Sequence, residues 1–296
     1  MIKLNHAPQP YSAAALGKVR RPRILAPTVA IAVIAFSGSA LSDTPPSSIA
    51  APYSQQFFPD PTGVIATVNV NGTVKESGTF FQSLGTNGRT CATCHVASQA
   101  MSLSAKDIQA RFAETAGQDP LFAPIDGANC PSAGPGNTSD HSLLLKHGLI
   151  RIFLPVPVNA QFTVSVVHDP YGCAMVPGPN GGQPIVSAYR RPLPTTNLSF
   201  LSTVMFDGRE THAPLNNGQT FAANLAADLT QQALDAITTH AQAAQAPTAA
   251  QLADIVGFEL GLFTAQAHDA GAGSLSAGRA RRPRQPCKSA LLSGNQ

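Results

Sequence analysis

The spacing of apolar residues predicts three helices between residues 105 and 268. Residues 105–116 follow Ser104, a residue type that commonly caps a helix N-terminus, and place Ile108 on an apolar side. Residues 221–242 and 248–268 have longer helical patterns. The last of these segments has a nearly continuous core-facing stripe, which consists of Leu252, Ile255, Val256, Glu259, Leu260 and Phe263.

Weaker patterns predict further elements between these helices. Residues 141–152 and 196–206 are expected to form shorter helices, and apolar residues near 64–70 and 162–167 predict two short strands that form a small β hairpin. Residues 117–140 are rich in Gly, Pro and Asn, which predicts a long irregular loop. We therefore expect a mainly α domain with long irregular loops.

The N-terminal region differs in composition from the rest of the chain. Residues 1–23 hold five basic residues and no acid, and the apolar run 24–41 ends in small residues. This order is typical of a secretory signal peptide, so residues 1–42 are predicted as the signal and residues 43–56 as a flexible leader. The apolar run is also close to the length of a membrane span, so an uncleaved anchor is the alternative. In both cases the rest of the chain is exported, and a periplasmic location is expected.

The C-terminal segment 278–296 also has an unusual composition. It has five basic residues, no acid and no regular period, and we interpret it as a basic tail that arises from a frameshift. The two ends hold ten of the 19 Lys and Arg residues, so the body, residues 43–277, carries a formal charge of about −7. This acidic body lacks the basic surface of a nucleic-acid-binding protein, and no nucleic-acid partner is expected.

The strongest chemical motif is Cys91-Ala92-Thr93-Cys94-His95. In an exported protein this spacing is typical of covalent haem c attachment, in which both thiols bond the porphyrin and the histidine is the proximal iron ligand. A thioredoxin-like motif would need a βαβ pattern, which is not visible, and a zinc site would need a second ligand pair nearby. A disulfide between Cys91 and Cys94 would be strained and would leave His95 without a role. The sequence therefore predicts one covalent haem c.

Three further cysteines remain. Cys130 and Cys173 both lie in loops rich in Gly and Pro, and free thiols are uncommon outside the cytoplasm, so these two residues are predicted to form a disulfide. Two buried free thiols are the alternative. Cys287 has no evident partner and lies in the basic tail.

Three segments resemble the bacterial di-haem cytochrome c peroxidase superfamily, which includes the relative that matures methylamine dehydrogenase. They are residues 80–95 (FFQSLGTNGRTCATCH), 190–210 (RRPLPTTNLSFLSTVMFDGRE) and 255–266 (IVGFELGLFTAQ). The resemblance implies a cytochrome c-like haem domain over residues 57–277 and an activity in which electron transfer is coupled to hydrogen peroxide reduction. It also implies a small electron donor, such as a cytochrome c or a cupredoxin.

The resemblance also suggests roles for residues outside the motif. Arg191 and Arg209 are expected to bind haem propionates through bidentate hydrogen bonds. Met175 is a candidate for the distal iron ligand, beside His168 and Tyr189. A membrane partner is expected only if the signal segment is not cleaved.

Several features depart from this family. A second Cys-x-x-Cys-His motif is missing, and Phe206 stands where the family has a tryptophan before Asp-Gly-Arg. The family's catalytic glutamate has no clear counterpart. The chain is therefore interpreted as a truncated member that keeps the N-terminal haem domain. The alternatives are a mono-haem electron carrier without peroxidase turnover and a truncated fragment without function.

Overall fold

The structure is a computed structural model that describes residues 2–5, 54–74, 77–134, 136–178, 182–214 and 217–275. The predicted signal peptide lies outside these residues except for 2–5, and the basic tail 278–296 lies wholly outside them. None of the helices in the described ranges is long and apolar enough to span a membrane.

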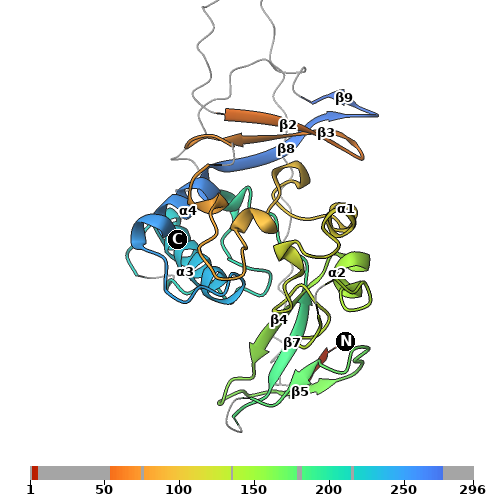
Figure 1. Cartoon of the computed structure of the whole chain (residues 1–296). Helices are drawn as coiled ribbons and strands as arrows, with labels where there is room; N and C mark the ends of the chain where they lie inside the picture. Colours follow the sequence, from red (N-terminus) through yellow and green to blue (C-terminus); the bar gives the residue numbers. More distant parts are fainter. Residues whose placement is uncertain are drawn as a thin grey trace, which may run out of the picture.

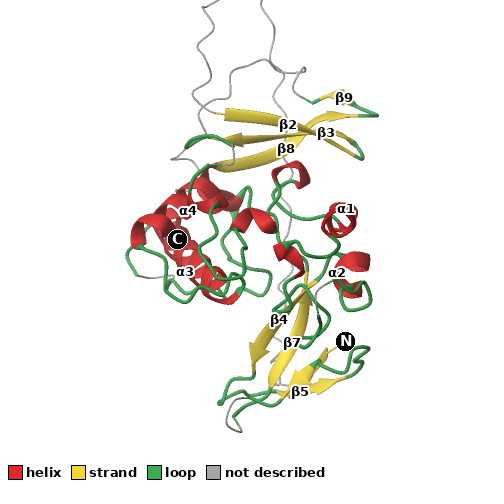
Figure 2. Cartoon of the chain, viewed as in Figure 1, coloured by secondary structure: helices red, strands yellow, loops and turns green. Residues whose placement is uncertain are grey.

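The structure has a mixed α/β fold (Figure 2). Helices account for 30% and strands for 21% of the described residues, so the expectation of a mainly α, cytochrome c-like domain is wrong. The difference arises because several segments without a clear period pair with distant strands. Long-range pairing of this kind depends on partners that a local sequence pattern does not show.

Four α-helices have capping residues that explain where they begin or end. Their bounds are α1 (Ala105–Thr115), α2 (Ser142–His147), α3 (Phe221–Thr239) and α4 (Ala249–Gly261). Ser104 caps α1 by accepting a hydrogen bond from the Asp107 amide at 3.1 Å, as predicted. Thr220 caps α3, and Thr248 forms a capping box with Gln251 at the start of α4.

Within the described ranges the strands form three sheets, of which the largest is antiparallel and has the order β2-β3-β8-β9. A second sheet has the order β4-β7-β6, and β1 pairs with β5. The strand bounds are β1 (Ile2–Asn5), β2 (Ser54–Asp60), β3 (Gly63–Asn69), β4 (Ile150–Pro155), β5 (Thr163–Val166), β6 (Met175–Val176), β7 (Ile185–Arg190), β8 (Leu262–Asp269) and β9 (Gly273–Ser274).

A β sheet, a helical region and a β ribbon follow one another along the molecule (Figure 1). The β2-β3-β8 sheet covers one end of the helical region, and the β4-β7 ribbon extends from the other end. One hydrophobic cluster joins α3 and α4 to the segment around Phe80, and another joins α1 and α2 to β4. The Cys-x-x-Cys-His segment lies between these clusters, because Cys91 packs on the first and Cys94 on the second.

Several predicted elements differ in the structure. The helix expected over 196–206 is only a short 3₁₀ turn, Leu198–Phe200. The helix expected to reach residue 268 ends at Gly261, where β8 begins, and residues 150–152 belong to β4 instead of a helix. The two predicted strands exist as β3 and β5 but do not pair with each other, and β2 includes the last three residues of the predicted leader.

Candidate functional site

A tight turn holds the two cysteines of the motif together. Cys91–Thr93 form a 3₁₀ helix that is capped by Thr90, whose amide donates to Thr93 Oγ1 at 3.0 Å. The carbonyl of Cys91 accepts hydrogen bonds from the amides of Cys94 at 3.2 Å and His95 at 3.0 Å. A hydrogen-bonded turn of this kind keeps the two Cα atoms within roughly 7 Å of each other. This range includes the separation that a disulfide needs.

The loop before the cysteines is hydrogen-bonded to the end of α3. The Thr86 amide donates to the Ala241 carbonyl at 3.1 Å, and the Asn87 side chain donates to the His240 carbonyl at 2.8 Å. Gly85 approaches the chain so closely that a Cβ there would overlap the Ala241 carbonyl. Glycine is needed at this position because the two backbones touch. The motif is thus positioned by α3, which lies far from it in sequence.

Both motif cysteines are free thiols with strongly raised pKa values. Burial, and to a smaller extent the charge of Glu259, raise the pKa of Cys91 to about 12. Burial also raises the pKa of Cys94, to about 11, although the positive charges of Arg89 and Arg111 oppose this effect. The neutral thiol is therefore the main form of both residues at pH 7.

His95 is tied to the backbone beside the cysteines. Its Nδ1 donates a hydrogen bond to the Met101 carbonyl at 3.0 Å, and the imidazole also interacts with the Leu193 carbonyl. Burial lowers the pKa of His95, while the two carbonyl contacts oppose that effect. The imidazole is thus held neutral and in a fixed orientation.

Glu259 is a buried acid on the core face of α4. Burial raises its pKa to about 7, and a hydrogen bond from the Thr195 hydroxyl at 2.9 Å opposes this shift. Its Oε2 atom is buried without a hydrogen-bond partner in the described part of the protein. The helical spacing in the sequence identifies Glu259 only as a member of the apolar stripe. A single acid within such a stripe is the signal that could have identified it.

A second group of charged residues lies at the junction of α3 and the 117–140 loop. The buried Arg89 forms an ion pair with Asp126, and Asp126 also accepts a hydrogen bond from Nδ1 of His240 at 2.5 Å. Burial raises the pKa of Asp126, but the hydrogen bond and charge of His240 and the charge of Arg89 outweigh it, so its pKa lies below the ordinary value. This cluster was not predicted from the sequence because its members are far apart in the chain.

A cavity of about 620 Å³ opens beside this cluster. Its charged and polar lining residues include Asp126, Arg151, Arg209, Glu210, Asp235 and His240, which come from the 117–140 loop, β4, the Asp-Gly-Arg turn and α3. The volume is within the usual range for small-molecule sites. Cys91, Cys94 and His95 do not line it.

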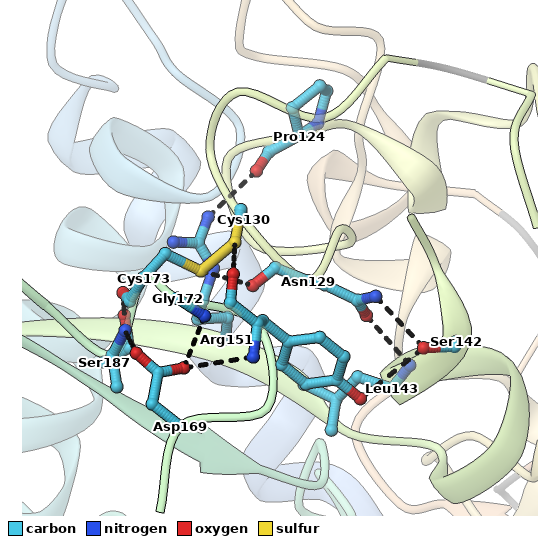
Figure 3. Close-up of a disulfide and its surroundings, with 12 residues drawn as sticks. Pro124, Asn129, Cys130, Ser142, Leu143, Arg151, Asp169, Gly172, Cys173 and Ser187 are labelled. Atoms are coloured by element: carbon cyan, nitrogen blue, oxygen red, sulfur yellow. Dashed lines mark hydrogen bonds between the residues drawn. A yellow bond between two sulfur atoms is a disulfide. The ribbon is translucent and has the colours of Figure 1, made fainter. Parts of the chain in front are cut away.

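The structure contains a disulfide between Cys130 and Cys173, whose Cα atoms are 5.9 Å apart (Figure 3). The disulfide joins the 117–140 loop to the segment before β6. The Asp169 carboxylate supports that segment by accepting hydrogen bonds from the amides of Tyr171, Gly172 and Ala174 at 3.1, 2.8 and 2.9 Å. Cys287 lies outside the described residues.

The other predicted site residues do not gather around His95. Arg191 is exposed and donates to the His147 carbonyl at 2.9 Å. Arg209 forms ion pairs with Asp207 and Glu210 and lines the cavity. Met175, the candidate distal ligand, lies on the edge strand β6 with 36% of its surface exposed.

The prediction of a covalently attached haem c is wrong on the geometry of this structure. Among the residues that it describes, no group of three or more His, Cys, Asp or Glu side chains is placed to hold a metal ion. The motif itself is present in the sequence, but its thiols pack into the hydrophobic clusters and its imidazole is directed at backbone carbonyls. The residues present therefore do not form a haem pocket.

Comparisons with known proteins do not add a family. The chain matches no protein-family model, no curated protein and no solved structure.

Proposed function

We propose that this protein is an exported dithiol oxidoreductase that reduces hydrogen peroxide with electrons from a small redox protein. The observation that carries the proposal is the placement of Cys91 and Cys94 as two free thiols in one hydrogen-bonded turn. The N-terminal sequence supports export to the periplasm. The resemblance to a superfamily of peroxide-reducing enzymes supports hydrogen peroxide as the oxidant.

The reaction needs no group beyond the two thiols, peroxide and the electron donor. A thiolate attacks one peroxide oxygen, the O–O bond breaks, and the products are a sulfenic acid and hydroxide, which takes up a proton to become water. The second thiol then attacks the sulfenic sulfur, so a disulfide forms and a second water leaves. Two electrons and two protons from the donor restore both thiols.

Cys94 is the better candidate for the attack on peroxide. Burial raises the pKa of both thiols, but the charge of Glu259 adds to this effect at Cys91, whereas the positive charges of Arg89 and Arg111 oppose it at Cys94 and the charges of Asp126 and Asp119 add to it there. Arg111 lies next to the motif, since its Nη1 donates to the Thr93 carbonyl at 2.7 Å. Cys91 is then the resolving thiol, and the short turn keeps its Cα within the range of the Cys94 Cα that a disulfide needs.

Glu259 is suited to act on the Cys91 proton. Its carboxyl group interacts electrostatically with the Cys91 thiol, and burial raises its own pKa to about 7. A carboxyl group with such a pKa can accept and return a proton near neutral pH. When Glu259 is ionised, its charge raises the pKa of Cys91. The ionisation of each group therefore depends on that of the other.

The test uses the full chain, exported to the periplasm and purified under reducing conditions. Peroxide consumption is measured together with peptide mass spectrometry of the Cys91–Cys94 segment. We expect this segment to lose two hydrogen atoms as peroxide is consumed, and we expect Cys94→Ser and Cys91→Ser to abolish the loss. Cys287→Ser is the matched control, because it removes a cysteine outside the motif and should change neither measurement.

Three results would contradict or narrow the proposal. Equal peroxide consumption in the wild type and Cys94→Ser would show that the reaction does not use this thiol. A gain in mass on both cysteines, as from a covalently attached haem, would show that the thiols are anchors for a group and not redox partners. Oxidation of the pair by a disulfide reagent but not by peroxide would reduce the function to electron transfer alone.

A further inference from the structure

We propose that one face of the β2-β3-β8 sheet rests on a lipid bilayer. The helical region covers the opposite face of this sheet (Figure 1). The proposal adopts the interpretation of the apolar run 24–41 as an uncleaved membrane anchor, and it does not depend on the reaction of the two cysteines.

The strand register shows which side chains point away from the body of the protein. Thr67 and Leu262 have no exposed surface, and Leu262 packs in the cluster that joins α3 and α4 to Phe80. Successive residues of a strand point to opposite faces, so Val68 and Phe263, which pair with each other, point outward. The outward positions of β2, β3 and β8 are called the outer face, and they include Phe57, Pro59, Val64, Ala66, Val68 and Phe263.

The outer face is apolar, although the exposed face of an antiparallel sheet is commonly polar. Within β2, β3 and β8 as the structure describes them, none of its positions holds Lys, Arg, Asp or Glu. Phe57 is 61% exposed, and Phe200, which is 64% exposed, extends the face because its ring centroid lies 5.5 Å from that of Phe263. An exposed apolar patch of this kind marks a contact surface.

A second copy of the chain fits this face poorly. Strands of 7 residues are about 23 Å long, and three neighbouring strands are about 14 Å wide. The footprint is therefore roughly 300 Å², whereas a stable interface buries about 800 Å² on each partner. The body also carries a formal charge of about −7, so two copies repel each other around so small an apolar contact.

The apolar run 24–41 favours a bilayer as the occupant. The run lies outside the described residues, and in the sequence it holds no charged residue and is close to the length of a membrane span. A single sheet face does not cover a helix that is apolar on all sides, because the other sides of the helix remain in water. A bilayer surrounds such a run and covers the outer face as well.

The position of the run in the chain brings the sheet to the same bilayer. Residues 42–53 connect the run to Ser54, the first residue of the edge strand β2, and they span at most about 40 Å. An anchored run therefore keeps β2 within reach of the membrane surface at a high effective concentration. Contact with the bilayer then removes the Phe and Val side chains of the outer face from water.

Tryptophan fluorescence of the full chain tests the proposal, because the chain has no Trp of its own. Phe57→Trp places a single probe on the outer face. Phe206→Trp is the control, because it places the probe outside the sheet, in the Asp-Gly-Arg turn, at a position that is 78% exposed. Each variant is mixed with vesicles of phosphatidylcholine that carries bromine on its acyl chains, which quenches a tryptophan that enters the bilayer. This lipid has no net charge, so it does not repel the acidic body.

We expect the emission of the Phe57→Trp variant to shift to shorter wavelength and to fall at least about twofold with brominated lipid, relative to the same lipid without bromine. The emission of the Phe206→Trp variant should not change.

A charge on the outer face provides a second measurement. Ala265 is exposed and faces Ala66 in the register of β3 and β8, so Ala265→Glu adds a charge without burying it in the fold. Combined with Phe57→Trp, it should remove most of the quenching, because a charged side chain is costly to place in a bilayer. Ala265→Gln is the matched control and should reduce the quenching less. Circular dichroism of each variant shows that the fold is kept.

Three results would overturn the proposal. Chain that floats with the vesicles while the Phe57→Trp variant is not quenched would show that the run alone holds the protein. Equal quenching of the Phe57→Trp and Phe206→Trp variants would show that adsorption does not use this face. Emission of the Phe57→Trp variant at short wavelength without lipid would show that the protein covers the face itself, through a second copy if the shift depends on protein concentration and through its own chain if it does not.

Discussion

Asp126 accepts a hydrogen bond from Nδ1 of His240 at 2.5 Å across 114 residues of sequence. The contact connects the 117–140 loop to the end of α3, and Arg89 joins it by pairing with the same carboxylate. Arg89 also donates from Nε to the Pro120 carbonyl at 2.7 Å and from Nη2 to the Leu121 carbonyl at 2.9 Å. Three distant segments are therefore held together around one buried carboxylate.

Asp126→Asn should strongly destabilise the protein, because it leaves the buried Arg89 without its counter-charge. Removal of one partner from a buried ion pair costs about 3–5 kcal/mol. Urea denaturation measures the change. Asp119→Asn is the control, since the Asp119–Arg111 pair is partly exposed and should contribute less. Equal losses in the two variants would show that Asp126 does not hold these segments together.

The stability of the protein should fall between about pH 4.5 and pH 7 because of Glu259. Its pKa is raised to about 7 in the folded state, against an ordinary value of 4.5. In this interval the unfolded chain loses the Glu259 proton first, so unfolding becomes more favourable as the pH rises, by roughly 3 kcal/mol in total.

Glu259→Gln should remove this component and make the protein more stable than the wild type at pH 8. Asp254→Asn is expected to act in the opposite direction, since hydrogen bonds from the Thr79 side chain and backbone lower the pKa of Asp254. Urea midpoints measured from pH 4 to pH 8 distinguish the two variants. A wild-type and a Glu259→Gln profile with the same slope would refute the assignment.

Alkylation of the motif thiols by iodoacetamide should be slow at neutral pH and accelerate steeply with alkalinity. With a pKa near 11, only roughly a thousandth of Cys94 is thiolate at pH 8. We expect the rate to rise about tenfold per pH unit up to pH 10, with Cys91 slower throughout. Peptide mass spectrometry follows each cysteine. A rate that levels off near pH 9 would mean that burial does not raise these pKa values.

The double replacement Cys130→Ser with Cys173→Ser should lower the free energy of unfolding by about 2–4 kcal/mol. The disulfide closes a loop with a sequence separation of 43 residues, and its loss frees the unfolded chain. Denaturation under oxidising conditions measures the difference. Cys287→Ser serves as the comparison for removal of a cysteine outside the loop. If the double variant matches that comparison, the disulfide does not stabilise the fold.

Local signals in the sequence were sufficient for some elements. Ser104 and Thr248 cap the helices that they were expected to begin, and the strand near 64–70 exists as β3. The strand β8 was missed because Leu262 and Phe263 continue the apolar stripe of α4, so the change from helix to strand is not visible in the period. The change is set by pairing with β3, which comes much earlier in the sequence.

The candidate site was likewise only partly predictable. The spacing of Cys91 and Cys94 identified a pair of thiols that could take part in chemistry. It could not show which side chains would surround the turn. The pair Asp126 and His240 could not be found from the sequence, because each residue alone is unremarkable in its segment. Arg151 is a charged residue within an apolar strand, and this mismatch was a usable signal.

The disulfide also has a consequence for how the protein matures. Cys91 and Cys94 precede Cys130 and Cys173 in the chain, so during export the two earlier thiols meet an oxidising compartment first. Four cysteines allow three pairings, and two of these would bond a motif thiol to a loop cysteine. Because Cys91 and Cys94 lie in one turn, the disulfide between them is expected to form faster than either mixed pairing. Once it has formed, Cys130 and Cys173 are the two thiols that remain of these four, and they pair with each other to close the longer loop.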